Sequence, residues 1–310
     1  MSYYVEDLLE RVKRRSFAPI SQSTFQDSDL IDLLNEELDL NLVANLVEER
    51  EDFFLTTEDT SIIANTNYYS IPSRAIGNAL KTLFYVDSSG NLSSLKLIDP
   101  SRRGEFSQTG SSPSAFYIEG DEVVLVPTPS LSTGSLRFSF PSKPNKLIAT
   151  SSCAKITTVT NNDPTATFAV NTDLTADLSV GDYVDFLSVT SPYKLWSYRI
   201  PITQITSSEI EVDLSDVINQ AGTSIEPQVN DYICPSGYAN IPQIPTAYHP
   251  VLAQMAVVTM LEGLGDLNKL ARAGATLQKL EINAKKLIRN RVESSPKKLS
   301  SKGSLVRFLK

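Results

Sequence analysis

Few residues in this 310-residue chain have the types and spacing that enzymatic chemistry needs. The single histidine, His249, lies in the stretch PTAYHP, and any Ser–His–Asp or Cys–His site would have to use it. Because it precedes Pro250 at a predicted helix start, we expect a capping or structural role instead. No glycine-rich phosphate loop, dinucleotide fingerprint or HExxH zinc motif occurs in the sequence. We therefore predict that the protein is not an enzyme and uses no cofactor or metal.

Cys153 and Cys234 are the only two cysteines, and neither belongs to a CxxC pair. We expect them to be reduced, semi-buried thiols. The alternative is a disulfide that closes the segment between them, which requires maturation in an oxidising compartment.

The composition, with 41% apolar and 21% charged residues, is that of a globular protein of about two domains. No run approaches the ~20 apolar residues that a membrane span requires. The first residues, MSYYVEDLLERVKRR, place charges where a signal peptide needs an uninterrupted apolar stretch. We expect a protein made and used without secretion and without a membrane partner.

The charge is unevenly distributed along the chain. The net charge is −8, yet residues 285–310 hold nine cations against the single acid Glu293, which leaves −16 for residues 1–284. This asymmetry predicts a C-terminal tail that docks on a negatively charged partner. Phosphates of nucleic acid and carboxylates of a protein are both candidates. Because the body is acidic and an apolar stretch follows the cations, we favour a groove on a protein.

The stretch DSDLIDLLNEELDLNLVANLVEEREDFF, residues 27–54, predicts a long helix after a short amphipathic helix at 2–15. Its apolar residues form two arcs. One arc comprises Leu30, Ile31, Leu34, Leu38, Leu42 and Leu46. The other comprises Leu33, Leu40, Ala44 and Val47. Such a helix either lies at the centre of one domain or also packs on a neighbouring subunit through Leu33, Leu40 and Val47.

Short runs rich in Tyr, Phe, Val and Ile follow residue 60 and predict strands, with EGD at 119–121 as a tight hairpin. Residues 148–238 predict about six further strands in a small barrel or sandwich. If this unit is an insertion, its two ends should be close in space. Its aromatic residues could alternatively stack on sugars, and they are Tyr183, Tyr193, Trp196 and Tyr198.

Helical periodicity returns after IPQIPTAYHP, first in VLAQMAVVTMLEGLG and then across 266–292. In the second helix, two heptad-spaced series are offset by three residues, which favours packing inside a domain over a free coiled coil. The fold class is therefore α+β, with a helical bundle-like core built from the N- and C-terminal helices and a β-hairpin region. We predict a composite domain of 1–147 and 239–310, and an inserted β domain of 148–238.

The order of these phrases resembles the head–tail connector (adaptor) proteins of tailed bacteriophages. The resemblance is carried by YYSIPSRAIGNALKTLFYVD, LKLIDPSRRGEF, PSAFYIEGDEVVLVPTPS and IPTAYHPVLAQMAVVTMLEGLGD. It covers about 1–147 and 240–310. Residues 148–238 depart from the minimal plan of that family.

The resemblance implies a ring of identical subunits, commonly twelve, in the virion neck, assembled in the host cytoplasm. The ring would attach to the portal protein, receive the tail tube or nozzle protein, and let DNA pass without sequence-specific binding. Tail fibres are a further partner for 148–238, and a tail-associated module that recognises a fibre or a glycan is the alternative function. The expected portal-docking residues, in the tail 294–310, are Lys297, Lys298, Lys302, Leu305, Arg307, Phe308 and Leu309.

Overall fold

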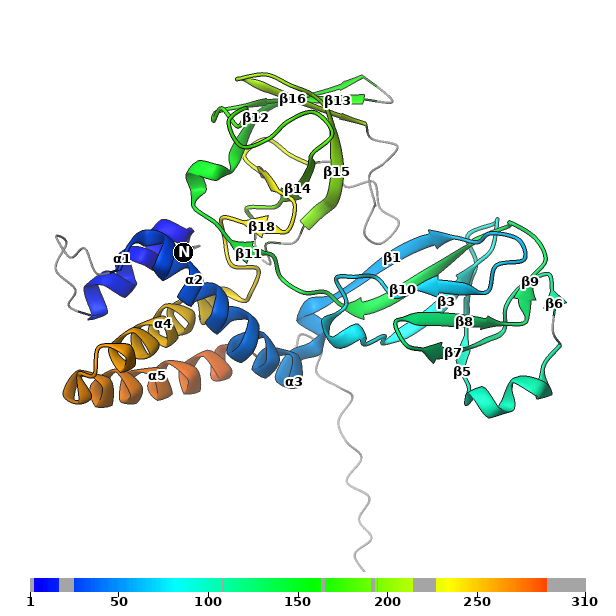
Figure 1. Cartoon of the computed structure of the whole chain (residues 1–310), viewed down its shortest axis with the longest axis horizontal. Coiled ribbons are helices and arrows are strands. Elements are labelled where there is room, and N and C mark those ends of the chain that lie inside the picture. Colours follow the sequence, from blue (N-terminus) through cyan, green and yellow to red (C-terminus); the bar gives the residue numbers. More distant parts are fainter. Residues whose placement is uncertain are drawn as a thin grey trace, which may run out of the picture.

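The protein combines a helical bundle, a β sandwich and a closed β barrel in one chain (Figure 1). The computed structural model describes residues 3–16, 25–107, 109–162, 165–190, 193, 195–213 and 227–288. The expected α+β class is confirmed, because helices and sheets are both extensive and occupy separate regions.

The bundle is built from both ends of the chain. Its helices are α1 (Val5–Ser16), α2 (Asp27–Glu36), α3 (Val43–Phe54), α4 (His249–Gly263) and α5 (Leu267–Leu287). Helix α4 lies at the centre and contacts α1, α2 and α5. Ten of its 15 residues are buried, in agreement with a sequence that is apolar on every side. Residues near the two ends of the chain therefore share one hydrophobic core.

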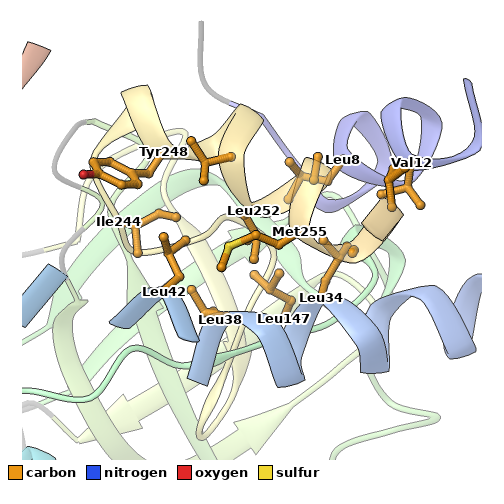
Figure 2. Close-up of a cluster of buried hydrophobic side chains, with 14 of the residues drawn as sticks. Leu8, Val12, Leu34, Leu38, Leu42, Leu147, Ile244, Tyr248, Leu252 and Met255 are labelled. Atoms are coloured by element: carbon orange, nitrogen blue, oxygen red, sulfur yellow. The ribbon is translucent and has the colours of Figure 1, made fainter. Parts of the chain in front are cut away.

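The predicted helix at 27–54 contains a π-helical segment, η1 (Glu37–Leu42), between α2 and α3. Its leucines recur every four residues from Leu30 to Leu46, and all five are buried. At 100° per residue, these 16 steps would turn the last leucine about 160° away from the first. The wider i→i+5 turns of a π-helix rotate less per residue and so correct this drift. Figure 2 shows the result, with Leu34, Leu38 and Leu42 lying along one side toward Leu252 and Met255.

The second apolar arc of this segment is not a continuous stripe. Leu33 and Val47 are half-buried and pack against the same bundle core, whereas Leu40 in η1 is 68% exposed. Helix α5 likewise packs inside the chain, through buried Ala273 and Ala284. The bundle therefore uses one stripe of the 27–54 segment, and a role of the second arc in subunit contact stays a prediction.

The chain between α3 and the barrel forms the sandwich wing, residues 55–141. Its longer strands are β1 (Leu55–Ser61), β2 (Tyr68–Ser70), β3 (Thr82–Val86), β4 (Leu92–Ser94), β7 (Ala115–Glu119), β8 (Glu122–Val126) and β10 (Ser135–Pro141). Two-residue strands are β5 (Lys96–Leu97), β6 (Thr109–Gly110) and β9 (Thr128–Pro129). The sheets β1-β10-β3-β4 and β2-β8-β7-β5 share one core. The expected hairpin at 119–121 is confirmed, since β7 and β8 pair around Gly120, whose φ is 63°.

Six strands close into a barrel in the order β12-β13-β16-β15-β14-β17. They are β12 (Ala154–Asn162), β13 (Thr165–Val170), β14 (Tyr183–Leu187), β15 (Leu195–Ile205), β16 (Glu209–Asp213) and β17 (Tyr232–Pro235). Inward side chains alternate with outward ones, most clearly in β13, and Phe168 and Phe186 meet in the interior. The predicted small barrel of about six strands is therefore present, and closure leaves it without free edges.

The chain enters and leaves the barrel at one place. Strand β11 (Lys146–Leu147) runs parallel to β18 (Tyr238–Ala239). Just inside this pair, Cys153 and Cys234 form a disulfide across a Cα–Cα distance of 4.5 Å. The expectation of two reduced thiols is thus wrong, because the closed barrel brings together two positions that are 81 residues apart in the sequence. The domain division at 148–238 stays a prediction.

His249, at the start of α4, is fully buried and has a structural place in the fold. Its Nδ1 accepts the backbone N–H of Tyr3 at 3.4 Å, and its Nε2 lies 3.2 Å from the carbonyl oxygen of Ile244. Because a carbonyl oxygen can only accept, Nε2 carries the proton and the ring is neutral. Burial lowers the pKa of His249 to about 4. The ring therefore links the start of the chain to α4 only while it stays uncharged.

The leucine repeat yields a direct test of the bundle core. Leu38→Ala should lower the free energy of unfolding by about 2–5 kcal/mol, because it leaves a cavity against α4. Leu40→Ala, two residues away in the same π-helical segment but exposed, should change it by less than about 0.5 kcal/mol. Urea unfolding followed by circular dichroism measures both. Equal losses for the two variants would contradict the assignment of a single buried stripe.

The buried histidine predicts a pH dependence of stability. Between about pH 6.5 and 4 the unfolded chain binds a proton at His249 that the folded protein does not, so stability should fall by about 3 kcal/mol as pH decreases. Carboxylates also titrate in this range, so the comparison is with His249→Gln, which cannot gain the proton. The stability advantage of the natural protein over this variant should shrink from pH 7 to pH 4 in urea titrations. A pH-independent difference would show that the histidine is not held neutral.

Candidate functional site

The portal-docking residues predicted in the tail, from Lys297 to Leu309, lie outside the described residues. The structure describes the chain as far as residue 288, which precedes that tail. Helix α5 ends at Leu287, and Lys285 in its last turn pairs with Glu49 of α3. This hydrogen bond raises the pKa of Lys285. The chain therefore leaves the bundle beside α3.

Of the three predicted subunit-contact residues, only Leu40 presents most of its side chain to solvent. It borders a groove of about 590 Å³ between the α2–η1 face and the β11–β18 pair. This acidic groove is lined by Ser28, Ile31, Asp32, Asn35, Glu36, Asp39, Leu40, Tyr238 and residues 146–149. Leu33 and Val47 do not line it. The three predicted contact residues therefore do not form one surface: Leu33 and Val47 pack against the bundle core, whereas Leu40 borders the acidic groove.

The wall of the acidic groove is fixed by hydrogen bonds. Asn35 donates from Nδ2 to the carbonyl of Leu147 at 3.0 Å and accepts the N–H of the same residue at 2.6 Å. These two hydrogen bonds hold β11 against α2, so the groove is formed within a single copy of the chain. Its rim carries Asp32, Glu36 and Asp39, of which Asp39 pairs with Lys143 at 2.9 Å. A rigid groove with carboxylates beside exposed apolar groups suits a partner surface that is both cationic and apolar.

A second groove, of about 580 Å³, lies between α1, α4 and α5 and has the opposite charge. Arg14, Arg15, Lys269 and Arg272 line this basic groove. The Arg15 guanidinium donates to the Pro250 carbonyl at 3.2 Å and to Gln254 Oε1 at 2.9 Å, both neutral groups. Burial, helped by nearby Arg11, lowers the pKa of Arg15. The bundle thus presents separate negative and positive surfaces.

Sequence reasoning missed the basic groove, because its cations come from two stretches some 250 residues apart. The phrases RVKRR and NKLARAG hold the relevant residues, but only the packing of α1 and α5 on α4 brings them together. The acidic groove was easier to anticipate from the sequence than the basic groove. Residues 27–54 are crowded with carboxylates, and Leu40 was singled out within them.

A buried polar junction joins the wing to the barrel. Asp185 of β14 is fully buried and accepts hydrogen bonds from Asn145 Nδ2, Ser236 Oγ and the backbone N–H groups of Arg199 and Gly237. Their lengths are 2.7 to 2.9 Å. The Arg74 guanidinium of the wing lies 3.9 Å from the same carboxylate. One buried charge therefore organises the base of the barrel and attracts the wing.

The other half of this junction is the pair of Glu58 in β1 and Tyr198 in β15. The Tyr198 hydroxyl donates to the Glu58 carboxylate, and Arg74 lies over the tyrosine ring at 5.1 Å. Burial raises the pKa of Glu58 and, together with the adjacent carboxylate, also that of Tyr198. Because these contacts are directional, they fix the angle between wing and barrel.

The barrel aromatics considered for sugar stacking do not form an exposed platform. Tyr193 and Tyr198 are buried, and Trp196 is half-buried with its indole N–H donated to Asp231. Tyr183 is 47% exposed and lies beside the Arg199 guanidinium. The Tyr193 ring packs against His249 at a centroid distance of 5.6 Å.

The polar junction predicts a strong effect of one isosteric change. Asp185→Asn turns an NH₂ group toward groups that donate, and it leaves Arg74 without its buried countercharge. The free energy of unfolding should fall by about 3 kcal/mol. Asp182→Asn, an exposed position three residues earlier, should cost less than about 0.5 kcal/mol. Thermal unfolding compares the two, and similar melting temperatures would contradict the role given to Asp185.

No helix in the described part of the chain is long and apolar enough to span a membrane. None of the curated proteins matches the chain significantly. The family model for the SU10 adaptor protein matches residues 3–169, more than half of the chain, and extends past the wing into the first two barrel strands. The chain therefore belongs to the SU10 adaptor protein family of phage head–tail adaptors.

Proposed function

We propose that this protein is a structural adaptor that joins the phage portal vertex to the tail as a ring of identical subunits. The family match over residues 3–169 carries the proposal, because it identifies an adaptor of the virion. In this proposal the ring lies in the neck, assembles in the host cytoplasm, and receives the tail tube or nozzle protein on its other side. The protein contributes binding surfaces and performs no catalysis.

The charge distribution supports different binding roles for the C-terminal tail and for the rest of the chain. Residues 285–310 have a net charge of +8 and end in LVRFLK, whereas residues 1–284 have −16. A cationic and apolar segment gains its contacts when a partner supplies the complementary groove. In a ring, many such tails engage one portal, so that weak single contacts add through a high effective concentration. The tail is therefore our candidate for portal docking.

The acidic body supports the role of a DNA conduit. Carboxylates repel the phosphate backbone, so a channel with an excess of them holds DNA weakly and lets it slide. We propose that DNA passes the ring without sequence-specific contacts. The barrel lies on one side of the bundle in Figure 1, and we propose its outward surface for contact with a tail fibre or another tail protein.

Replacing the tail cations tests portal docking. Lys297→Glu, Lys298→Glu and Lys302→Glu together should abolish co-sedimentation with purified portal while the melting temperature stays unchanged. The same loss is expected from deleting residues 294–310. Deletion and charge reversal should agree, because both remove the attraction that brings the apolar end to the portal.

A control with the same change in net charge excludes a general electrostatic effect. Lys96, Arg103 and Lys279 are exposed on the wing and on α5. Their replacement by Glu should leave portal binding intact. Normal co-sedimentation of the tail variants, or equal losses for both triple variants, would count against docking by the tail.

A further inference from the structure

The turn between α4 and α5 exposes apolar and cationic side chains on a rigid frame. We define the α4–α5 corner as Leu264, Leu267, Lys269 and Arg272. Leu267 is 76% exposed and Leu264 is also exposed. In Figure 1 this turn lies at the free end of the bundle, away from the barrel and the wing.

The corner is held by its own backbone and needs no leucine contact to form. Gly265, at a φ of 70°, ends α4 in the left-handed conformation that favours glycine, and its N–H donates to the Glu262 carbonyl at 3.0 Å. Asp266 then caps α5 by accepting the N–H of Lys269 at 3.1 Å. Since the turn is fixed this way, the exposed Leu264 and Leu267 are available for an interaction outside the subunit.

The acidic groove is complementary to this corner in both charge and polarity. The groove offers Asp32 and Glu36 beside exposed Leu40 and Tyr238, with Lys146 as the one cation among its lining residues. The corner offers Lys269 and Arg272 beside two leucines, and Asp266 between these leucines pairs with Lys269 at 3.1 Å. The basic groove, which shares Lys269 and Arg272 with the corner, strengthens the positive potential there through Arg14 and Arg15. At about 590 Å³, the acidic groove has the size of pockets that enclose several side chains.

We propose that the α4–α5 corner of one copy of this chain docks in the acidic groove of the next copy. Within one copy the two surfaces cannot meet, since the corner lies at the free end of the bundle while the groove lies beside β11 and β18 (Figure 1). Contacts between two different surfaces are heterologous and propagate around a ring when the rotation closes. Nucleic acid does not suit the groove, because its carboxylates repel phosphate. This inference rests on the proposed ring and names the surfaces that join its subunits.

Exchange of charges between the two surfaces tests the contact. Arg272→Glu and Glu36→Lys should each weaken association of subunits at least tenfold, because each places like charges together. A chain carrying both changes should regain association. A mixture of the two single variants should regain it as well, since each corner then finds a groove of opposite charge on the other variant. Sedimentation velocity, with and without purified portal, provides the measurement.

Disulfide capture tests the same contact at the leucines. The natural cysteines are already paired inside the barrel, so Leu40→Cys and Leu267→Cys introduce the reactive thiols. A chain with both changes should form a ladder of cross-linked oligomers under mild oxidation. A mixture of the two single variants should give a cross-linked dimer. The matched control pairs Leu267→Cys with Leu131→Cys, an exposed leucine of the wing, and should remain monomeric on a non-reducing gel.

The outcomes separate this inference from the proposed function. Multi-copy assembly on the portal without cross-linking between positions 40 and 267, or without rescue by the charge exchange, would overturn the corner–groove contact and leave the adaptor role intact. Cross-linking of Leu40→Cys to portal instead of to a second copy would also overturn it. Absence of any multi-copy assembly, with or without portal, would overturn the ring itself.

Discussion

Burial of α4 is the constraint on which the rest of this structure depends. This helix is apolar on every side, so it is stable only when α1, α2 and α5 cover it together. Two of these helices come from the first 36 residues, and the third follows α4 near the other end of the chain. The wing and the barrel are therefore held between two halves of one bundle. The wing and the barrel each have a hydrophobic core of their own, and the bundle core holds the segments of chain that precede the wing and follow the barrel.

Polar contacts then set the orientation of these parts, which hydrophobic burial alone leaves undefined. Asn35 fixes β11 on α2, Asp185 gathers the strands at the base of the barrel, and the Glu58–Tyr198 pair holds the wing to it. Each of these groups is buried or half-buried and is satisfied only by partners from another part of the chain. Breaking one leaves a polar atom without a partner in a dry place, so alternative angles are disfavoured. Such rigidity suits the proposed adaptor, which would have to match the geometry of both the portal and the tail.

The sequence predicted the type of most elements but not their three-dimensional relations. Alternating residues and turn signals located the β7–β8 hairpin and the six barrel strands, because those signals are local. The π-helical segment was missed, although the strict four-residue repeat from Leu30 to Leu46 does not fit one face of a straight α-helix and was available as a signal. The Cys153–Cys234 disulfide was only the alternative to reduced thiols, and the basic groove was missed, since both depend on contacts between residues distant in sequence. The tail stayed a prediction because its residues lie outside those described.

The placement of exposed leucines indicates how such a protein could stay soluble before assembly. Leu40 borders a groove whose lining residues include three carboxylates and one cation, whereas Leu267 precedes Lys269 and Arg272 of a groove lined by four cations. Two identical surfaces therefore repel one another while the unlike surfaces attract. This arrangement disfavours symmetric dimers and favours head-to-tail association, the type of contact that can form a ring. The proposed contact joins charged residues at the protein surface, so salt should weaken the association of two subunits in solution. On a portal the tails would bring neighbouring copies together, and the same contact would become effectively intramolecular. In the proposed ring, charge segregation and template binding would thus act together to delay ring closure until a partner is present.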